Sequence, residues 1–278
     1  MSLPALLGFG RLLRRRRKPD FLIIGAQRCG TTSLFHYLAG HPRVAVPREK
    51  ELHFFDLQYQ KGFRWYVDCF AGTDTRKSAR RAIRGEATPE YIFHPHAIPR
   101  IKADLPKVKL IALLRNPVDR AYSQYWHEVR LGYEPLSFEE AIAREPARLA
   151  GELERAEIDA HYNGRAMIHH SYLLRGIYAD QLMRVFRHFP RSQVMLLRSE
   201  DLFADPQDVF GQVTDFLGLE RQAIADPRNM TAVTEGTRDV RPPPIPTAVR
   251  HRLAGHFRAH NQRLYTLVGL DFGWEEAG

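Results

Sequence analysis

The segment FLIIGAQRCGTTS, residues 21–33, constrains the fold most strongly, because it predicts a buried strand, a glycine loop and a helix in direct succession. The strand, expected over Asp20–Gly25, contains four consecutive large apolar residues, which is typical of a strand covered on both faces. The helix is expected over Thr31–Ala39. A glycine loop in this position directs backbone N–H groups and the positive end of a helix toward an anion.

The same alternation of strand and helix recurs along the chain, which predicts an α/β fold with a central, mainly parallel sheet flanked by helices. Further strands are expected at 108–114 and 193–197. Asn116-Pro117 and Asp205-Pro206 each combine a capping side chain with proline at the first helical position. Long helices are expected at 171–190 and 247–268.

Length and charge indicate one basic domain. The 278 residues fit a single α/β unit, predicted over 19–278 and preceded by a basic N-terminal tail, residues 1–18. The formal net charge of +9 favours anionic partners such as nucleic acid, membrane surfaces, nucleotides or acidic glycans. The tail is interpreted either as a solvated segment or as a weak contact to a membrane surface or polyanion.

Cysteine content and hydropathy predict a cytoplasmic protein without a transmembrane segment. Only two cysteines are present, Cys29 and Cys69, so no disulfide framework is expected and a reducing compartment is favoured. The N-terminal apolar run precedes the basic run, the reverse of the order in a signal peptide. No apolar segment reaches the roughly 20 residues that span a bilayer.

The glycine loop lacks the lysine of a Walker motif. Gly25 and Gly30 keep the Walker spacing, but Thr31 stands where the lysine is expected, and Arg28 is the cation within the loop. This speaks against an ordinary ATPase and leaves either a loop for a different anion or a structural turn.

A second candidate anion site follows the strand at 108–114. Arg115 lies at the carboxyl end of that strand, where ligands bind in doubly wound sheets, and Ser123 lies about 10 Å further along the following helix. Both side chains are therefore within reach of one phosphate beside the first helical turns. Arg120, between them, is interpreted as a surface ion pair.

Five motifs together resemble the sulfotransferases that use 3′-phosphoadenosine 5′-phosphosulfate (PAPS), close to their heparan-sulfate and bacterial carbohydrate branch. They span residues 20–275 in the family's order and read GAQRCGTTSL, KELHFFD, GEATPEYIF, RNPVDRAYS and HNQRLYTLVGLDFGW. The resemblance implies a P-loop-like sulfotransferase fold, PAPS as the cofactor and 3′,5′-ADP (PAP) as its product. It also implies a small-molecule or glycan acceptor and no nucleic-acid partner.

The resemblance assigns donor-binding residues to three regions. Arg115 and Ser123 correspond to the 3′-phosphate motif, and Arg238 and Arg241 fall where relatives place a basic loop over the nucleotide. The 5′-phosphosulfate loop supplies the remaining residues, which are Gly25, Gln27, Arg28, Cys29, Gly30, Thr31, Thr32 and Ser33.

The resemblance also implies the catalytic residues. Arg28 stands where the family has lysine and would stabilise the bridging oxygen, although a guanidinium does not donate a proton at neutral pH. Glu51 would be the general base with His53 as its partner, both on one face of an extended segment with Leu52 toward the core. His53 and Glu86 are candidate substrate contacts.

The predicted function is transfer of a sulfuryl group from PAPS to a hydroxyl or amine of a glycan or glycan-like acceptor by in-line displacement. The alternatives are a P-loop nucleotide kinase and a non-catalytic polyanion-binding protein. No metal site is expected, because the paired histidines at 94, 96, 169 and 170 have no further ligand at metal-site spacing. Acceptor specificity is expected from residues 56–80 and 130–170, the latter either a lid or a surface helix.

Overall fold

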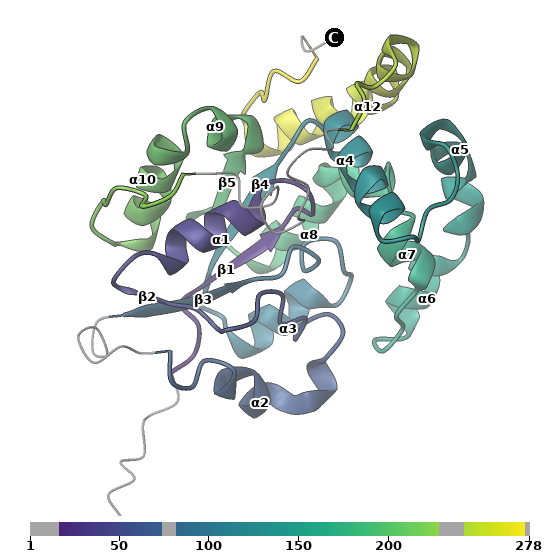
Figure 1. Ribbon diagram of the computed structural model, residues 1–278. Helices are drawn as coiled ribbons and strands as arrows, with labels where there is room; N and C mark the ends of the chain where they lie inside the picture. The colour runs from purple at the N-terminus through teal and green to yellow at the C-terminus, as the bar shows by residue number, and fades with distance from the viewer. Residues whose placement is uncertain (1–16, 74–81, 228–241, 276–278) are drawn as a thin grey trace, which may run out of the picture.

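A five-stranded parallel sheet forms the centre of the computed structural model, which describes residues 17–73, 82–227 and 242–275 (Figure 1). Its strand order is β2-β3-β1-β4-β5, and each pairing between neighbours is parallel. The predicted α/β class with a parallel sheet is therefore confirmed. The strands are β1 (Phe21–Gly25), β2 (Val44–Ala45), β3 (Ile83–Ala87), β4 (Lys109–Leu114) and β5 (Val194–Arg198).

Helices cover both faces of the sheet. Figure 1 shows α1 in front of the sheet and α3 and α8 behind it, while α4 to α7 form a group beside the carboxyl ends of the strands. The helices are α1 (Thr31–Ala39), α2 (Gly62–Asp68), α3 (Ala97–Asp104), α4 (Pro117–Arg130), α5 (Phe138–Arg148), α6 (Glu152–Ile158), α7 (Arg165–His169), α8 (Tyr178–His188), α9 (Ser199–Ala204), α10 (Pro206–Leu217) and α12 (Thr247–Val268).

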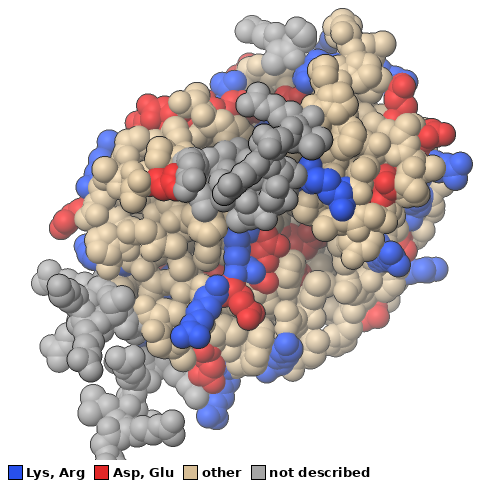
Figure 2. All heavy atoms as spheres, viewed as in Figure 1, with Lys and Arg blue, Asp and Glu red and all other residues tan. Residues whose placement is uncertain are grey.

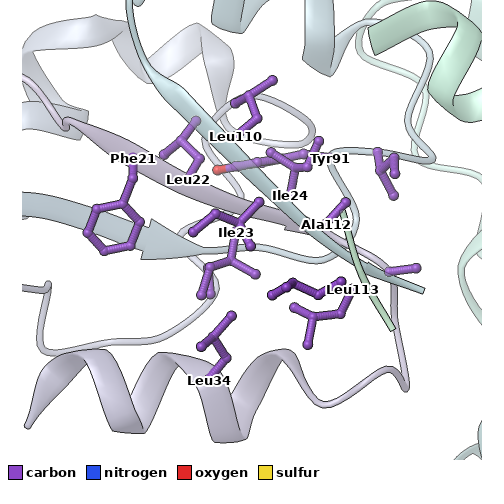
Figure 3. Packing of buried hydrophobic residues seen from close by; sticks show 14 of the residues in the cluster. Phe21, Leu22, Ile23, Ile24, Leu34, Tyr91, Leu110, Ala112 and Leu113 are labelled. Carbon is purple, nitrogen blue, oxygen red and sulfur yellow. The ribbon is translucent and has the colours of Figure 1, made fainter. Parts of the chain in front are cut away.

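Strand β1 runs through the middle of the core, and all five of its residues are buried. Successive side chains of a strand point to opposite faces, so β1 needs apolar partners on both sides. Figure 3 shows Ile23 on the side of Leu34 from α1, and Leu22 and Ile24 on the opposite side with Leu110 and Tyr91. Burial on both faces explains the continuous apolar run in the sequence.

The predicted helix starts after β4 and β5 are confirmed. The Asn116 side chain accepts a hydrogen bond from the Val118 N–H at 3.0 Å, with Pro117 at the first helical position of α4. Asp205 caps α10 in the same way, and Gly218 ends that helix with a φ of 74°. Helix α4 thus begins directly after β4, whereas α10 follows β5 only after the short helix α9.

Two local predictions are wrong. The helix expected over 171–190 begins only at Tyr178, because the buried carboxylate of Glu145 accepts the N–H groups of Leu173 and Leu174 and holds that stretch in another conformation. Arg120 is not a surface ion pair: it is fully buried and donates to Gln124 Oε1 at 2.9 Å and to the Tyr172 carbonyl.

Two residues next to the predicted domain boundary contact the rest of the domain. Arg17 and Lys18, which the prediction places in the tail, contact the domain: the Arg17 carbonyl accepts from Arg84 at 2.9 Å, and Lys18 donates to the Asp104 carbonyl at 2.9 Å. The rest of the tail lies outside the described residues. Among the helices that are described, none combines the length and apolarity needed to cross a bilayer.

Gly85 of β3 gives a direct test of this packing, because a Cβ there would lie 2.3–2.4 Å from ring atoms of Phe21. Gly85→Ala is expected to lower the free energy of unfolding by about 1–3 kcal/mol through overpacking. The control is Gly255→Ala inside α12, where no atom lies within 4 Å of the added carbon and stability should rise by about 0.5–1 kcal/mol. Urea denaturation of both variants measures the difference, and equal effects would contradict the assigned packing.

Candidate active site

The candidate site lies where the carboxyl ends of β1 and β4 meet. The connection after β1 runs toward β2 and β3, whereas the connection after β4 runs to β5 on the other side. Such a change of direction opens a crevice at the carboxyl ends of the strands, which is where α/β proteins bind ligands. The glycine loop leaves β1 at this point, and Arg115 follows β4.

Neighbouring elements hold the backbone of the glycine loop in place. The Arg28 carbonyl accepts from Arg115 Nη1 at 3.3 Å, and the Cys29 carbonyl accepts from Ser199 Oγ at 2.7 Å. Gly30 has a φ of 88°, and a Cβ there would lie 3.0 Å from Leu202. Glycine is therefore required at position 30 both for its conformation and for the close approach of α9.

The loop fits the anionic end of a nucleotide donor. Helix α1 begins at Gly30 without a side-chain cap from any described residue, so the N–H groups of its first turn keep their capacity for an anion. Gln27 lines the adjacent cleft, and its buried Oε1 has no hydrogen-bond partner among the described residues. A buried polar atom without a partner is unusual, and a donor group on a ligand would satisfy it.

The predicted loop residues do not all face the site. The Cys29 side chain is fully buried between the Gln27 carbonyl and Tyr178, and burial raises the pKa of its thiol. Ser33 is also buried and hydrogen-bonds to Tyr37. Thr31 is 4% exposed, and Thr32 is half-buried. The side chains of Cys29 and Ser33 thus pack on the buried side of the loop.

The structure brings Arg28, Ser123 and Arg115 together. Arg28 Nε donates to Ser123 Oγ at 3.1 Å, and Arg28 Nη1 lies 3.4 Å from His127 Nδ1. A guanidinium only donates, so His127 accepts at Nδ1 and carries its proton on Nε2. The two predicted anion sites are therefore parts of one polar cluster, and α4 contributes His127 to it.

Glu51 and His53 form a chain of ionic contacts with two residues that the sequence analysis did not assign. His53 Nε2 lies 3.6 Å from Glu51 Oε2, and His53 Nδ1 lies 2.7 Å from Asp56 Oδ2. Lys50 Nζ contacts Glu51 Oε1. Asp56 is fully buried beneath the histidine, so it fixes the orientation of the imidazole ring.

The segment that carries this pair is not extended, contrary to the prediction. Glu51 has a φ of 65° and His53 a φ of 48°, and with Arg28 at 68° they are the three non-glycine residues of positive φ in the described ranges. Such conformations cost on the order of 1–3 kcal/mol and gather at functional sites. Leu52 is buried between the two, as predicted.

Charge pairing sets the protonation of both groups. Burial by itself raises the pKa of Glu51, but the His53 hydrogen bond and the Lys50 charge outweigh it and lower the pKa to about 2. Burial lowers the pKa of His53, but the hydrogen bonds that its ring donates to Asp56 and Glu51 outweigh this effect and raise the pKa to about 10. At neutral pH the pair is therefore a carboxylate beside an imidazolium.

Glu86, predicted as a substrate contact, is fully buried in β3. Its Oε1 accepts from Tyr91 at 2.8 Å and from Tyr66 at 3.2 Å, and its Oε2 accepts from Thr88 at 2.8 Å. Burial raises the pKa of Glu86 to about 7, although these hydrogen bonds lower it. The structure therefore speaks against an acceptor contact and gives Glu86 a role in packing β3 against the segment of Phe54.

A cleft of about 220 Å³ separates the Glu51 segment from α4 and α7. Helix α7 forms one wall, so the predicted region 130–170 does border the site, through a short helix rather than an unstructured lid. The lining consists of Gln27, Glu51, His53, Leu57, Pro89, Glu90, His94, His127, Glu128, Leu131, Tyr162, Asn163, Gly164, Met167, Ile168 and His169.

Two predictions fall partly beyond what the structure describes. Arg238 and Arg241 lie outside the described residues. Among the residues that are described, no three potential ligands converge on one metal position, and the expectation of metal-independent chemistry stays a prediction.

Comparison with known proteins identifies the family. The model of the sulfotransferase domain matches residues 18–235 of this chain. This chain belongs to the sulfotransferase family. The predicted enzyme class, a sulfotransferase, is thereby confirmed.

Relatives and a solved structure agree with this assignment. The sulfotransferase is 32% identical to human heparan sulfate glucosamine 3-O-sulfotransferase 6, over 98% of this chain and 77% of the relative. It is 30% identical to the crystal structure of a sulfotransferase from Alicyclobacillus acidocaldarius, with a TM-score of 0.73, covering 93% of this chain and 99% of the other. The P-loop-like sulfotransferase fold is thus confirmed.

The predicted cytoplasmic location is wrong. The membrane-associated sulfotransferase kil1 of Dictyostelium discoideum is 26% identical to this chain, over 92% of it and 66% of the relative. Two cysteines and the order of charged and apolar residues at the N-terminus do not determine the compartment. The chain also covers only about two thirds to three quarters of these curated relatives.

The His53 pairing predicts a specific dependence of stability on pH. Since folding raises the pKa of His53 from about 6.5 to about 10, its contribution is complete below pH 6.5 and disappears as pH rises through 10. The stability difference between wild type and His53→Gln should therefore be largest near pH 6 and shrink toward pH 10, as measured by urea denaturation. His251→Gln on the exposed side of α12 is the control. The same pH dependence in both variants would contradict the pairing.

Proposed function

We propose that this sulfotransferase transfers a sulfuryl group from PAPS to a hydroxyl or amine of a glycan or glycan-like acceptor, with Glu51 as the general base. The carrying observation is that His127, which contacts Arg28, lines the same cleft as the Glu51–His53 pair. The names of similar proteins, which include heparan sulfate sulfotransferases, support a glycan acceptor.

The donor side of the proposal rests on the polar cluster around the loop. PAPS, when bound, supplies the sulfuryl group and an anionic leaving group. The first turn of α1 and Arg115 with Ser123 would hold the two phosphate ends, and the Arg28 guanidinium would stabilise negative charge on the bridging oxygen. The guanidinium has five N–H donors, so the bond from its Nε to Ser123 Oγ is compatible with this role.

The acceptor side rests on the Glu51 carboxylate. With a pKa of about 2 it is ionised at neutral pH and ready to accept a proton, but the contact with Lys50 makes it a weak base. Opening the Lys50 contact raises its basicity. His53, held by Asp56, keeps the second oxygen of Glu51 oriented toward the cleft.

The two alternatives have less support. A nucleotide kinase requires the Walker lysine, which Thr31 replaces. A polyanion-binding protein without catalysis has no need for a buried aspartate, histidine and glutamate in series, or for three residues in costly backbone conformations.

Ligand binding provides the first test. PAP at about 100 times its Kd should raise thermal stability by about 2.7 kcal/mol, and ATP with Mg²⁺ or heparin should stabilise far less. Arg115→Ala should lose about 10- to 100-fold in PAP affinity with little change for 5′-AMP, because a charge-assisted hydrogen bond contributes about 1.5–3 kcal/mol. Equal losses for both nucleotides would give Arg115 a structural role, and selective stabilisation by ATP with Mg²⁺ would favour the kinase.

Catalytic variants provide the second test. Glu51→Gln keeps the shape of the side chain but removes the base, so kcat should fall by about 10² to 10⁴ while PAP affinity stays near that of wild type. Arg28→Ala should lower kcat and also weaken PAPS, because the cation contacts the donor before and during transfer. Near-normal turnover of Glu51→Gln would refute the base assignment, and loss of PAP binding in that variant would show that Glu51 supports the nucleotide site.

A further inference from the structure

The acceptor cleft differs in charge from the rest of this basic chain. The chain carries a net charge of +9, yet among the described residues the cleft lining contains three carboxylates, four histidines and neither lysine nor arginine. Figure 2 shows acidic side chains within the hollow near the centre of this face, with basic side chains next to them.

Two of the three carboxylates already have strong cationic partners. Glu51 contacts Lys50 and His53. Glu90 forms a bidentate ion pair with the buried Arg175, at 2.6 and 2.8 Å. Lys50 and Arg175 lie outside the cleft lining, and His53, which is part of the lining, is already engaged by Glu51 and Asp56.

Glu128 is the third carboxylate, and its side chain contacts a histidine. It is 2% exposed at the end of α4, and its Oε2 lies 2.9 Å from His169 Nδ1. The ring of Tyr133 packs on His169 with centroids 4.0 Å apart, which fixes the imidazole. The wall opposite Glu51 is thus a rigid carboxylate–histidine pair, which suits hydroxyl groups and opposes a second anion.

The cleft also has apolar surface. Its apolar lining residues are Leu57, Pro89, Leu131, Met167 and Ile168. A pocket that combines apolar surface with a few fixed acceptors matches the C–H faces and hydroxyl groups of a sugar ring. An anionic sugar would instead lose its hydration beside carboxylates, and the His53 imidazolium in the lining is already paired with Glu51 and Asp56.

We propose that this cleft binds an uncharged sugar unit and discriminates against uronate or sulfated chains, with Glu128 and His169 as specificity-determining residues. The inference rests on the proposed function and narrows its acceptor from glycans in general to uncharged sugars. It separates this chain from the relatives named for heparan sulfate, which is a polyanion.

Matched acceptors test the proposal on the full chain. Gluco-, galacto-, manno- and N-acetylglucosaminides are compared with uronates of the same linkage, with labelled PAPS as donor. The kcat/KM of the best neutral glycoside should exceed that of its uronate partner and of a heparan-type oligosaccharide by about tenfold or more. A preference for the uronate, the heparan-type chain or a cationic amino sugar would overturn the proposal, as would the absence of transfer to every neutral member.

Two variants test whether Glu128 causes the discrimination between neutral and anionic acceptors. Glu128→Gln should reduce the preference for neutral over uronate acceptors by about tenfold, because it removes the opposing charge and keeps the shape. Glu154→Gln, on the exposed face of α6, is the matched control and should leave the preference unchanged. An unchanged preference in Glu128→Gln would remove Glu128 from the proposal.

Thermal stabilisation by PAP is measured in parallel for each variant. If the wild-type protein does not bind PAP, the proposed function itself is refuted. Retained PAP binding together with a preference for anionic acceptors would refute the acceptor inference alone.

Discussion

The parallel pairing of β1 with β4 is the constraint on which the site depends. Both strands are buried on both faces, and their register, with Gly25 beside Ala112, brings their carboxyl ends to the same edge of the sheet. This pairing places Arg115 where it reaches the Arg28 carbonyl and lets the start of α4 approach the glycine loop. The anion-binding groups thus follow from strand pairing, although they are about 90 residues apart in sequence.

Charge pairing organises the interior around that edge. Charged groups are paired in series from the buried Asp56 through the partly buried His53 to Glu51, and in the buried Glu90–Arg175 pair. Paired buried charges are rarely a source of net stability, because desolvation offsets much of their attraction. Their value here is orientation: each pair fixes a side chain that borders the cleft.

The sequence predicts the parts of the fold that carry local signals and misses those determined by tertiary contacts. Strand β1, helix α1 and the capped starts of α4 and α10 follow from apolar runs, glycine, and proline beside a capping residue. Strand β3, which reads IRGEA, has no apolar pattern, because the hydroxyl groups of Tyr66, Thr88 and Tyr91 compensate for its buried glutamate. Because these hydrogen bonds cannot be inferred from the sequence, Glu86 was predicted to contact the substrate, whereas it is a core residue.

For the site, family motifs identify the residues but not how they are connected. Asp56 lies within the KELHFFD segment, and the His53 imidazole contacts it. The backbone there has positive φ at Glu51 and His53, a geometry that the alternation of side chains along an extended strand does not predict. Motifs do not predict His127 and Glu128 either, because both lie on α4 beyond the phosphate motif. They line the cleft because α4 packs against α7 and the loop. The donor-binding half of such a site can therefore be predicted from the residues of one loop. The acceptor-binding half is assembled from separate elements, so its charge is known only from the structure.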